Sequence, residues 1–213
     1  MTGPAYYIAI EGVIGVGKTS LARILSRHLD SRLILEKFEE NPFLPDFYRD
    51  RQRYAFQTQL FFLLSRYRQQ MELMQTDVFH RSLITDYIFA KDRLFAYINL
   101  EEKELHLYDQ LYSILSREVT KPDLVIYLQA DTDRLMKNID LRGRDYEQNM
   151  DRDYIDSLNQ FYNQYFFHYN ETPLLIINTT HIDFVNKKED LEELMKYIQQ
   201  PPAGTKYYKA GNA

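Results

Sequence analysis

The chain has no cysteine and no tryptophan among its 213 residues. The absence of cysteine excludes a disulfide scaffold, a thiol nucleophile and a cysteine-based metal site. Long hydrophobic runs are also missing: the longest strictly apolar runs, such as residues 60–64, are far shorter than the roughly 18 residues of a membrane span. No basic segment followed by an apolar stretch begins the chain, so no signal peptide is expected. We therefore expect a soluble, cytoplasmic protein that does not bind a membrane.

The chain also has fewer basic than acidic residues. The 26 lysines and arginines are outnumbered by 31 acidic residues, which gives a net charge of −5 at pH 7. A protein that wraps nucleic acid needs a net basic face, so a nucleic-acid polymer is excluded as a partner. With roughly 150 residues per domain as a guide, we expect one domain over residues 1–200. Residues 201–213 (PPAGTKYYKAGNA) are expected to form a loose tail.

Short apolar runs alternate with longer helical patterns along the chain. The runs show little in–out alternation, which is typical of parallel strands covered on both faces. The alternation predicts an α/β fold with a parallel sheet, whose functional loops follow the carboxyl ends of the strands. The apolar runs are 6–11, 32–36, 82–86, 124–129 and 174–178, and the helical patterns are 18–30, 53–77, 101–118, 132–140, 153–170 and 188–199.

A phosphate-binding loop is the strongest motif, because residues 12–19 read GVIGVGKT and fit G-x-x-x-x-G-K-S/T fully. The motif follows a predicted strand and opens a predicted amphipathic helix. Its glycines let backbone N–H groups face an anion, and the helix adds its positive amino end. Lys18 is expected to reach the β- and γ-phosphates, and Thr19 to hold Mg²⁺. The candidate ATP-binding residues are Gly12, Val13, Ile14, Gly15, Val16, Gly17, Lys18 and Thr19.

An arginine pair, Arg142 and Arg144, flanks one glycine late in the chain. Phosphoryl transfer spreads negative charge over phosphate oxygens, and two guanidinium groups on a lid over residues 141–151 would neutralise it and exclude water. A solvated charged loop is the alternative. A GTPase is not favoured, because the sequence NKKE at 186–189 has glutamate where N-K-x-D requires aspartate. These features together favour a small-molecule kinase.

Several segments resemble the deoxyribonucleoside kinases, and most closely the bacterial deoxyadenosine/deoxyguanosine kinases. The resemblance covers nearly the whole chain and implies a five-stranded parallel sheet flanked by helices, with an arginine-bearing lid. It also implies transfer of the ATP γ-phosphoryl group to the 5′-hydroxyl of a deoxynucleoside, and a homodimer or a heterodimer with a paralogue. The segments are IAIEGVIGVGKTS, LEKFEENPF, YAFQTQLFFLLSRYRQ, ITDYIFAKD, DLVIYLQA and LRGRDYEQ.

Two acidic residues at predicted strand ends match catalytic positions of the family. Glu36 matches the general base that accepts the 5′-hydroxyl proton, although Glu39 and Glu40 lie near it. Asp86 matches the acid near Mg²⁺ and the phosphates. The family usually has arginine after this acid, whereas this chain has Tyr87, which removes one positive charge that would face the phosphates.

Base recognition is expected on the long helical segment. Gln59 and Arg66 are seven residues apart, so they share a helix face. By resemblance, Asp92 completes a Gln/Arg/Asp set around the edge of the base, a set more similar to purine- and cytosine-accepting members than to thymidine-specific ones. A surface polar stripe is the alternative for Gln59 and Arg66. An exposed charged turn is the alternative for Asp92, because Lys91 and Arg93 flank it.

The resemblance also indicates which residues bind the sugar of the nucleoside and the adenine of the ATP donor. Tyr48 and Glu147 resemble the pair that holds the 3′-hydroxyl. Many members carry an arginine four residues before Arg142 that stacks on the adenine of ATP, but this chain has Asn138, so Arg142 is a candidate for that stacking. The preference for dA, dG or dC stays open, with purines favoured.

Two other functions stay open. A nucleoside-monophosphate kinase similar to thymidylate kinase would need extra basic residues, for which Arg49, Arg51 and Arg53 are candidates. A nucleotide-binding regulatory subunit would lack turnover, which the presence of Lys18 and Glu36 argues against.

Overall fold

The computed structural model describes residues 6–73 and 82–209. Its centre is a parallel sheet of six strands in the order β2-β3-β1-β4-β5-β6. Because β1 pairs with β3 on one side and β4 on the other, the loop after β1 leaves from the middle of the sheet. The strands are β1 (Tyr6–Gly12), β2 (Arg32–Ile34), β3 (Ser82–Thr85), β4 (Leu124–Gln129), β5 (Leu174–Asn178) and β6 (Thr205–Lys209).

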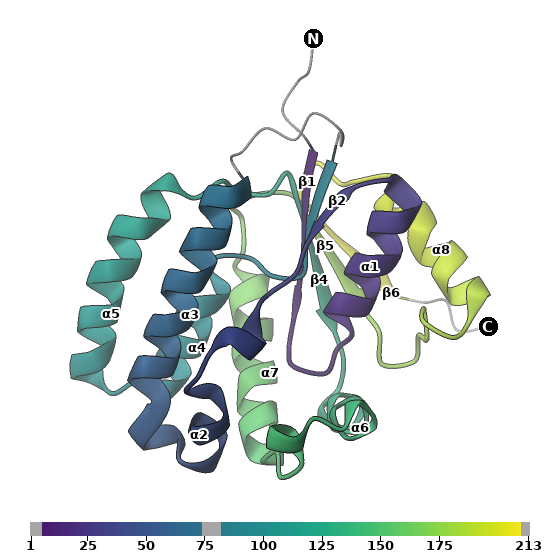
Figure 1. Ribbon diagram of the computed structural model, residues 1–213. Helices are drawn as coiled ribbons and strands as arrows, with labels where there is room; N and C mark the ends of the chain where they lie inside the picture. The colour runs from purple at the N-terminus through teal and green to yellow at the C-terminus, as the bar shows by residue number, and fades with distance from the viewer. Residues whose placement is uncertain (1–5, 74–81, 210–213) are drawn as a thin grey trace.

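Helices cover both faces of this sheet (Figure 1). One face carries α3, α4, α5 and α7, the other carries α1 and α8, and α2 and α6 lie near the carboxyl ends of the strands. The helices are α1 (Lys18–Leu29), α2 (Leu44–Arg49), α3 (Arg51–Leu73), α4 (Lys91–Asn99), α5 (Glu102–Leu115), α6 (Thr132–Arg142), α7 (Arg152–Phe167) and α8 (Lys188–Ile198), with short 3₁₀ turns η1 (Phe38–Glu40), η2 (Ser116–Glu118) and η3 (Asp145–Glu147).

The central strands are apolar because helices pack on both of their sides. Ile8 and Ile10 in β1 and Ile126 in β4 are almost fully buried, as expected for parallel strands without a solvent face. The predicted α/β fold is therefore confirmed. No helix within residues 6–73 and 82–209 is long and apolar enough to cross a membrane.

The prediction of five strands and a loose tail is wrong for residues 205–209. They form β6, which pairs with β5 so that Tyr208 lies opposite Ile177. The Tyr208 ring is buried 4.3 Å from the ring of Tyr197 in α8, while Tyr207 is exposed. Tyrosine favours strands, and the unpaired backbone of β5 would otherwise be an open sheet edge. Residues 210–213 of the predicted tail lie outside the described residues.

The helix predictions differ mainly at boundaries. Helix α3 begins at Arg51 rather than at residue 53, and residues 74–77 of the predicted helix lie outside the described residues. The short helices α2 and α4 were not predicted. Both are too short for the apolar periodicity of a helix to show clearly in the sequence.

Candidate active site

The phosphate-binding loop joins β1 to α1 and has glycines where side chains would not fit. Gly15 and Gly17 have φ angles of +87° and +102°, in the left-handed region that favours glycine. A Cβ atom on Gly15 would lie 2.7 Å from the backbone oxygen of Leu135 in α6, and one on Gly17 would lie 3.1 Å from the ring of Phe184. The motif glycines therefore let the loop pass close to its neighbours.

We expect Gly15→Ala to weaken ATP binding more than tenfold. The left-handed backbone alone costs about 1–3 kcal/mol with a Cβ atom, and the contact with Leu135 forces the loop or α6 to move. Calorimetry with ATP and thermal unfolding would measure both effects. Gly204→Ala is the matched control, because a Cβ atom there meets nothing within 4 Å. An ATP affinity equal to that of the Gly204→Ala control would contradict this account of the loop.

Lys18 and Thr19 begin α1 beside the loop. The Lys18 ammonium donates to the backbone oxygens of Gly12 at 2.6 Å and Val13 at 3.1 Å. Burial, followed by repulsion from the Lys91 charge, lowers the pKa of Lys18 to about 8. An arriving phosphate would bring further negative charge to this ammonium and favour its protonated form.

Asp86 connects this loop to the end of β2. Its Oδ2 accepts a hydrogen bond from the Thr19 hydroxyl at 2.6 Å, and its Oδ1 accepts one from the Glu36 backbone N–H at 2.7 Å. The two oxygen ligands predicted for Mg²⁺, from Thr19 and Asp86, are thus adjacent. They fit a hard cation that brings further oxygen ligands from phosphates. In the described part of the chain no group of three or more His, Asp or Glu side chains forms a separate metal site.

Glu36 follows β2, and two cations surround its carboxylate. Its Oε1 pairs with Arg66, and its Oε2 lies 2.5 Å from the Lys91 ammonium. Burial raises the pKa of Glu36, but the charges of Arg66 and Lys91 outweigh it and hold the pKa well below its usual range. Glu36 is therefore ionised, and both of its oxygens are engaged.

Arg66 also pairs with Asp92, so it bridges two carboxylates that come from separate segments. Asp92 is fully buried, which excludes the exposed charged turn considered for it. Lys91 is buried too, and only Arg93 of the three consecutive charges is exposed. Gln59 lies two turns before Arg66 on α3 and is also buried, so the two residues do not form a surface stripe.

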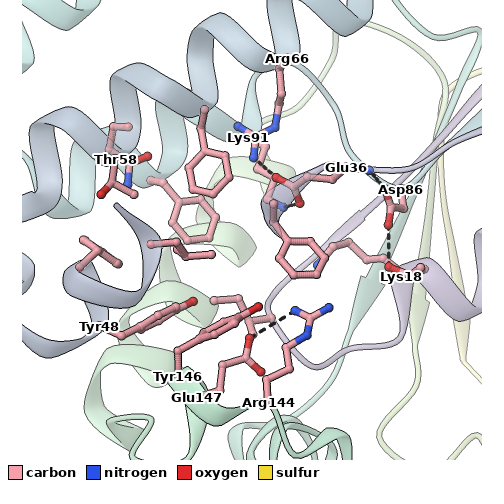
Figure 2. Close-up of a pocket in the computed structure, with 18 of the residues that line it drawn as sticks. Lys18, Glu36, Tyr48, Thr58, Arg66, Asp86, Lys91, Arg144, Tyr146 and Glu147 are labelled. Carbon is pink, nitrogen blue, oxygen red and sulfur yellow. Dashed lines mark hydrogen bonds and ion pairs between the residues drawn. The ribbon is translucent and has the colours of Figure 1, made fainter. Parts of the chain in front are cut away.

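A cavity, the inner cavity, runs from the end of β2 to α3 (Figure 2), and it is lined by Glu36, Gln59, Arg66 and Lys91 but not by Asp92. It is narrow, about 100 Å³, less than the few hundred Å³ typical of small-molecule sites. The inner cavity therefore has to widen when a nucleoside enters. The Thr58 hydroxyl is buried there without a partner in the described residues. The lining of the inner cavity includes Glu36, Tyr48, Thr58, Gln59, Phe62, Arg66, Lys91, Phe95 and Glu147.

A second cavity, the outer cavity of about 1090 Å³, borders the phosphate-binding loop. Lys18, Glu36 and Asp86 line both cavities, so they stand where the two meet. Asn138 also lines the outer cavity, and its amide donates to the Gly15 oxygen at 2.8 Å. The residue in place of the expected arginine therefore supports the phosphate loop.

The predicted lid places both arginines near Glu147. The Oε2 atom of Glu147 accepts hydrogen bonds from Arg142 at 2.5 and 3.0 Å, and its Oε1 atom accepts one from Arg144 at 3.4 Å. The Arg144 guanidinium also stacks on the Phe38 ring at 3.8 Å. Tyr48 approaches the same corner through stacking on Tyr146. The structure thus brings Tyr48 and Glu147 to one cavity, and Glu147 holds the arginines.

Sequence reasoning missed several residues of the inner cavity. Thr58 is adjacent to Gln59, and Lys91 is adjacent to Asp92, so proximity to predicted residues was the available signal. For Phe62, which lines the cavity together with Phe95, the helical spacing allowed stacking on a base but favoured packing in the core. The pattern did not distinguish these roles.

Known proteins with similar sequences and folds match over most of the chain. A family model described as deoxynucleoside kinase matches residues 8–201. A deoxyguanosine kinase of Bacillus subtilis is 32% identical over 92% of this chain and 97% of its own. A deoxyadenosine kinase of Lactobacillus acidophilus is 31% identical over 91% and 94%.

A solved structure supports the same assignment. The deoxyadenosine kinase from M. mycoides with bound dATP has a TM-score of 0.77 at 25% identity, and the match covers 91% of this chain and 99% of that one. The predictions of fold and kinase activity are thereby confirmed. The chain belongs to the deoxynucleoside kinase family.

Proposed function

We propose that the protein transfers the γ-phosphoryl group of ATP to the 5′-hydroxyl of a purine deoxynucleoside, in nucleotide salvage. One observation carries this proposal: Glu36 lies where the inner and outer cavities meet. A triphosphate on the loop would occupy the outer cavity, and a nucleoside would occupy the inner one. Their reacting ends would then meet at an ionised carboxylate.

The reaction follows from this placement. Glu36 accepts the proton of the 5′-hydroxyl, the oxygen forms a bond to the γ-phosphorus, and the bond to the leaving ADP oxygen breaks. Lys18 and the amino end of α1 hold the β- and γ-phosphates. Mg²⁺, held by Thr19 and Asp86, would neutralise phosphate charge. Arg142 and Arg144 would leave Glu147 for the phosphates when the lid closes.

The base proposal rests on Gln59 and Arg66, two buried polar residues of α3 that line the inner cavity, and on Asp92, which does not line it but pairs with Arg66. Gln59 offers a donor and an acceptor, Arg66 offers donors, and Asp92 has one buried oxygen without a partner in the described residues. Groups of this kind reject a base that leaves them unpaired. The purine preference is supported by relatives named deoxyguanosine kinase and deoxyadenosine kinase. The homodimer or heterodimer, the cytoplasmic location and the single domain over residues 1–200 stay predictions.

A nucleoside-monophosphate kinase is disfavoured by the arginines that it would need. Arg51 pairs with Asp151 at 2.7 Å, and Arg49 is exposed. Among the described residues that line the two cavities, neither they nor Arg53 occurs. The three arginines that this function would need therefore do not reach a substrate phosphate in the inner cavity.

The test is ADP release with each of the four deoxynucleosides, each monophosphate, and no acceptor. We expect turnover with deoxyadenosine or deoxyguanosine and only background without an acceptor. Turnover confined to monophosphates would overturn the proposal. ATP binding without any turnover would instead favour a regulatory subunit.

A further inference from the structure

Asp86 stands where the two cavities meet, and the residue that follows it carries no positive charge. Tyr87 follows Asp86, and its ring is fully buried. A tyrosine is uncharged and this one lines neither cavity, so its side chain cannot neutralise a phosphoryl group. Phosphoryl transfer depends on cations placed around the moving group. Another cation has to supply this charge beside Asp86.

Lys91, the first residue of α4, is that cation. Its side chain is 8% exposed, and its ammonium lies 2.5 Å from Oε2 of Glu36. It lines the inner cavity together with Lys18 and Asp86, and Figure 2 shows its ammonium directed at the Glu36 carboxylate. The Lys91 charge lowers the pKa of Lys18 and opposes the burial that raises the pKa of Glu11. Lys91 thus lies within electrostatic reach of the phosphate loop.

The partners of Lys91 differ from those of the other cations here. Arg66 is anchored by two carboxylates, so it stays paired when one of them is lost. In the described part of the chain, Lys91 has one ion pair, with Glu36, and a ring contact with Phe95. When Glu36 takes up a proton, its negative charge disappears. A buried ammonium that loses its ion-pair partner is destabilised, and the transferring phosphoryl group is the anion that arrives at that moment.

We propose that Lys91 is a catalytic residue, which releases Glu36 and binds an oxygen of the transferring phosphoryl group. This inference rests on the proposed function. The 5′-hydroxyl proton passes to Glu36, the new O–P bond forms and the bond to ADP breaks, while Lys91 keeps all its protons. Lys91 thereby supplies the charge that Tyr87 does not.

The test compares Lys91→Met, Lys91→Gln and Lys91→Arg with Lys103→Met, an exposed lysine on α5. We expect Lys91→Met and Lys91→Gln to lower kcat about 10²–10³-fold, the range for losing one preorganised hydrogen-bond donor. Lys91→Arg should retain most of the wild-type kcat. Deoxynucleoside affinity should change little. Affinity for ADP with aluminium fluoride, a mimic of the moving phosphoryl group, should fall in parallel with kcat, while affinity for ADP alone should not.

The outcomes separate this inference from the proposed function. Wild-type turnover is measured first, and its absence would overturn both. With an active wild type, near-normal kcat in Lys91→Gln would overturn the role of Lys91 only. Equal losses of ADP and fluoride-complex affinity would also overturn it, because they would indicate a structural role. Should Lys91→Met fail to fold, the kcat values of Lys91→Gln and Lys91→Arg still test the role of Lys91. Both variants keep hydrogen bonding at this position, but only Lys91→Arg keeps the positive charge.

Discussion

Glu36→Gln is expected to lower kcat about 10²–10⁴-fold, the usual contribution of a positioned general base, with deoxynucleoside affinity nearly unchanged. The amide has the same shape as the carboxylate and retains an oxygen that accepts from Arg66, but it cannot take up the 5′-hydroxyl proton. Arg66 stays paired with Asp92, so the end of the inner cavity proposed to recognise the base keeps its arrangement. Rates of ADP release and calorimetric titration with the nucleoside would measure the two quantities.

Glu40→Gln is the control for this substitution. Glu40 lies four residues further along, is exposed, and pairs with Lys37 at 3.5 Å on the surface. Surface pairs of this kind contribute roughly 0–1 kcal/mol to stability, and Glu40 is not among the residues that line either cavity. The kcat of Glu40→Gln should therefore match that of the wild type. If Glu36→Gln turned over at a near-normal rate, Glu36 would lose the role of general base and another group would have to accept the proton.

Features that are encoded locally could be predicted from the sequence. The phosphate loop was found because the glycines, Lys18 and Thr19 are consecutive with a strand and a helix on either side. Glu36 and Asp86 each end an apolar run and match acids of the deoxynucleoside kinases, and parallel strands bring their carboxyl ends to one edge. The side-chain bond between Thr19 and Asp86 spans 67 residues, yet topology alone brings the two together.

Features that depend on distant partners could not be predicted. The run Lys91-Asp92-Arg93 has the local character of an exposed turn, and only Arg66 and Glu36, on other segments, explain why its first two members are buried. Asn138 bonds to a backbone oxygen 123 residues away. Residues 205–209 have a polar composition, and they form a strand because β5 offers an open edge. Each of these features depends on residues that are far apart in the sequence and meet only in the folded protein.

Arg66→Met is expected to destabilise the protein by about 3–5 kcal/mol, the usual cost of breaking a buried ion pair from one side. Asp92 would be left fully buried without a cation, and Glu36 would keep only Lys91. Since small proteins are stable by only about 5–15 kcal/mol, the loss would be large. Urea unfolding would measure it, and deoxynucleoside binding should be lost together with turnover.

Two further variants distinguish a lost charge pair from lost packing. Arg93→Met removes an arginine that is exposed and pairs with Asp109 at the surface, so it should cost less than about 1 kcal/mol. Adding Asp92→Asn to Arg66→Met removes the stranded charge, so the double variant should be more stable than Arg66→Met alone although it has lost one more native group. A double variant that is less stable than the single one would show that methionine fits poorly beside Phe62 and Tyr87, whose rings face the guanidinium, and that charge is not the main cause.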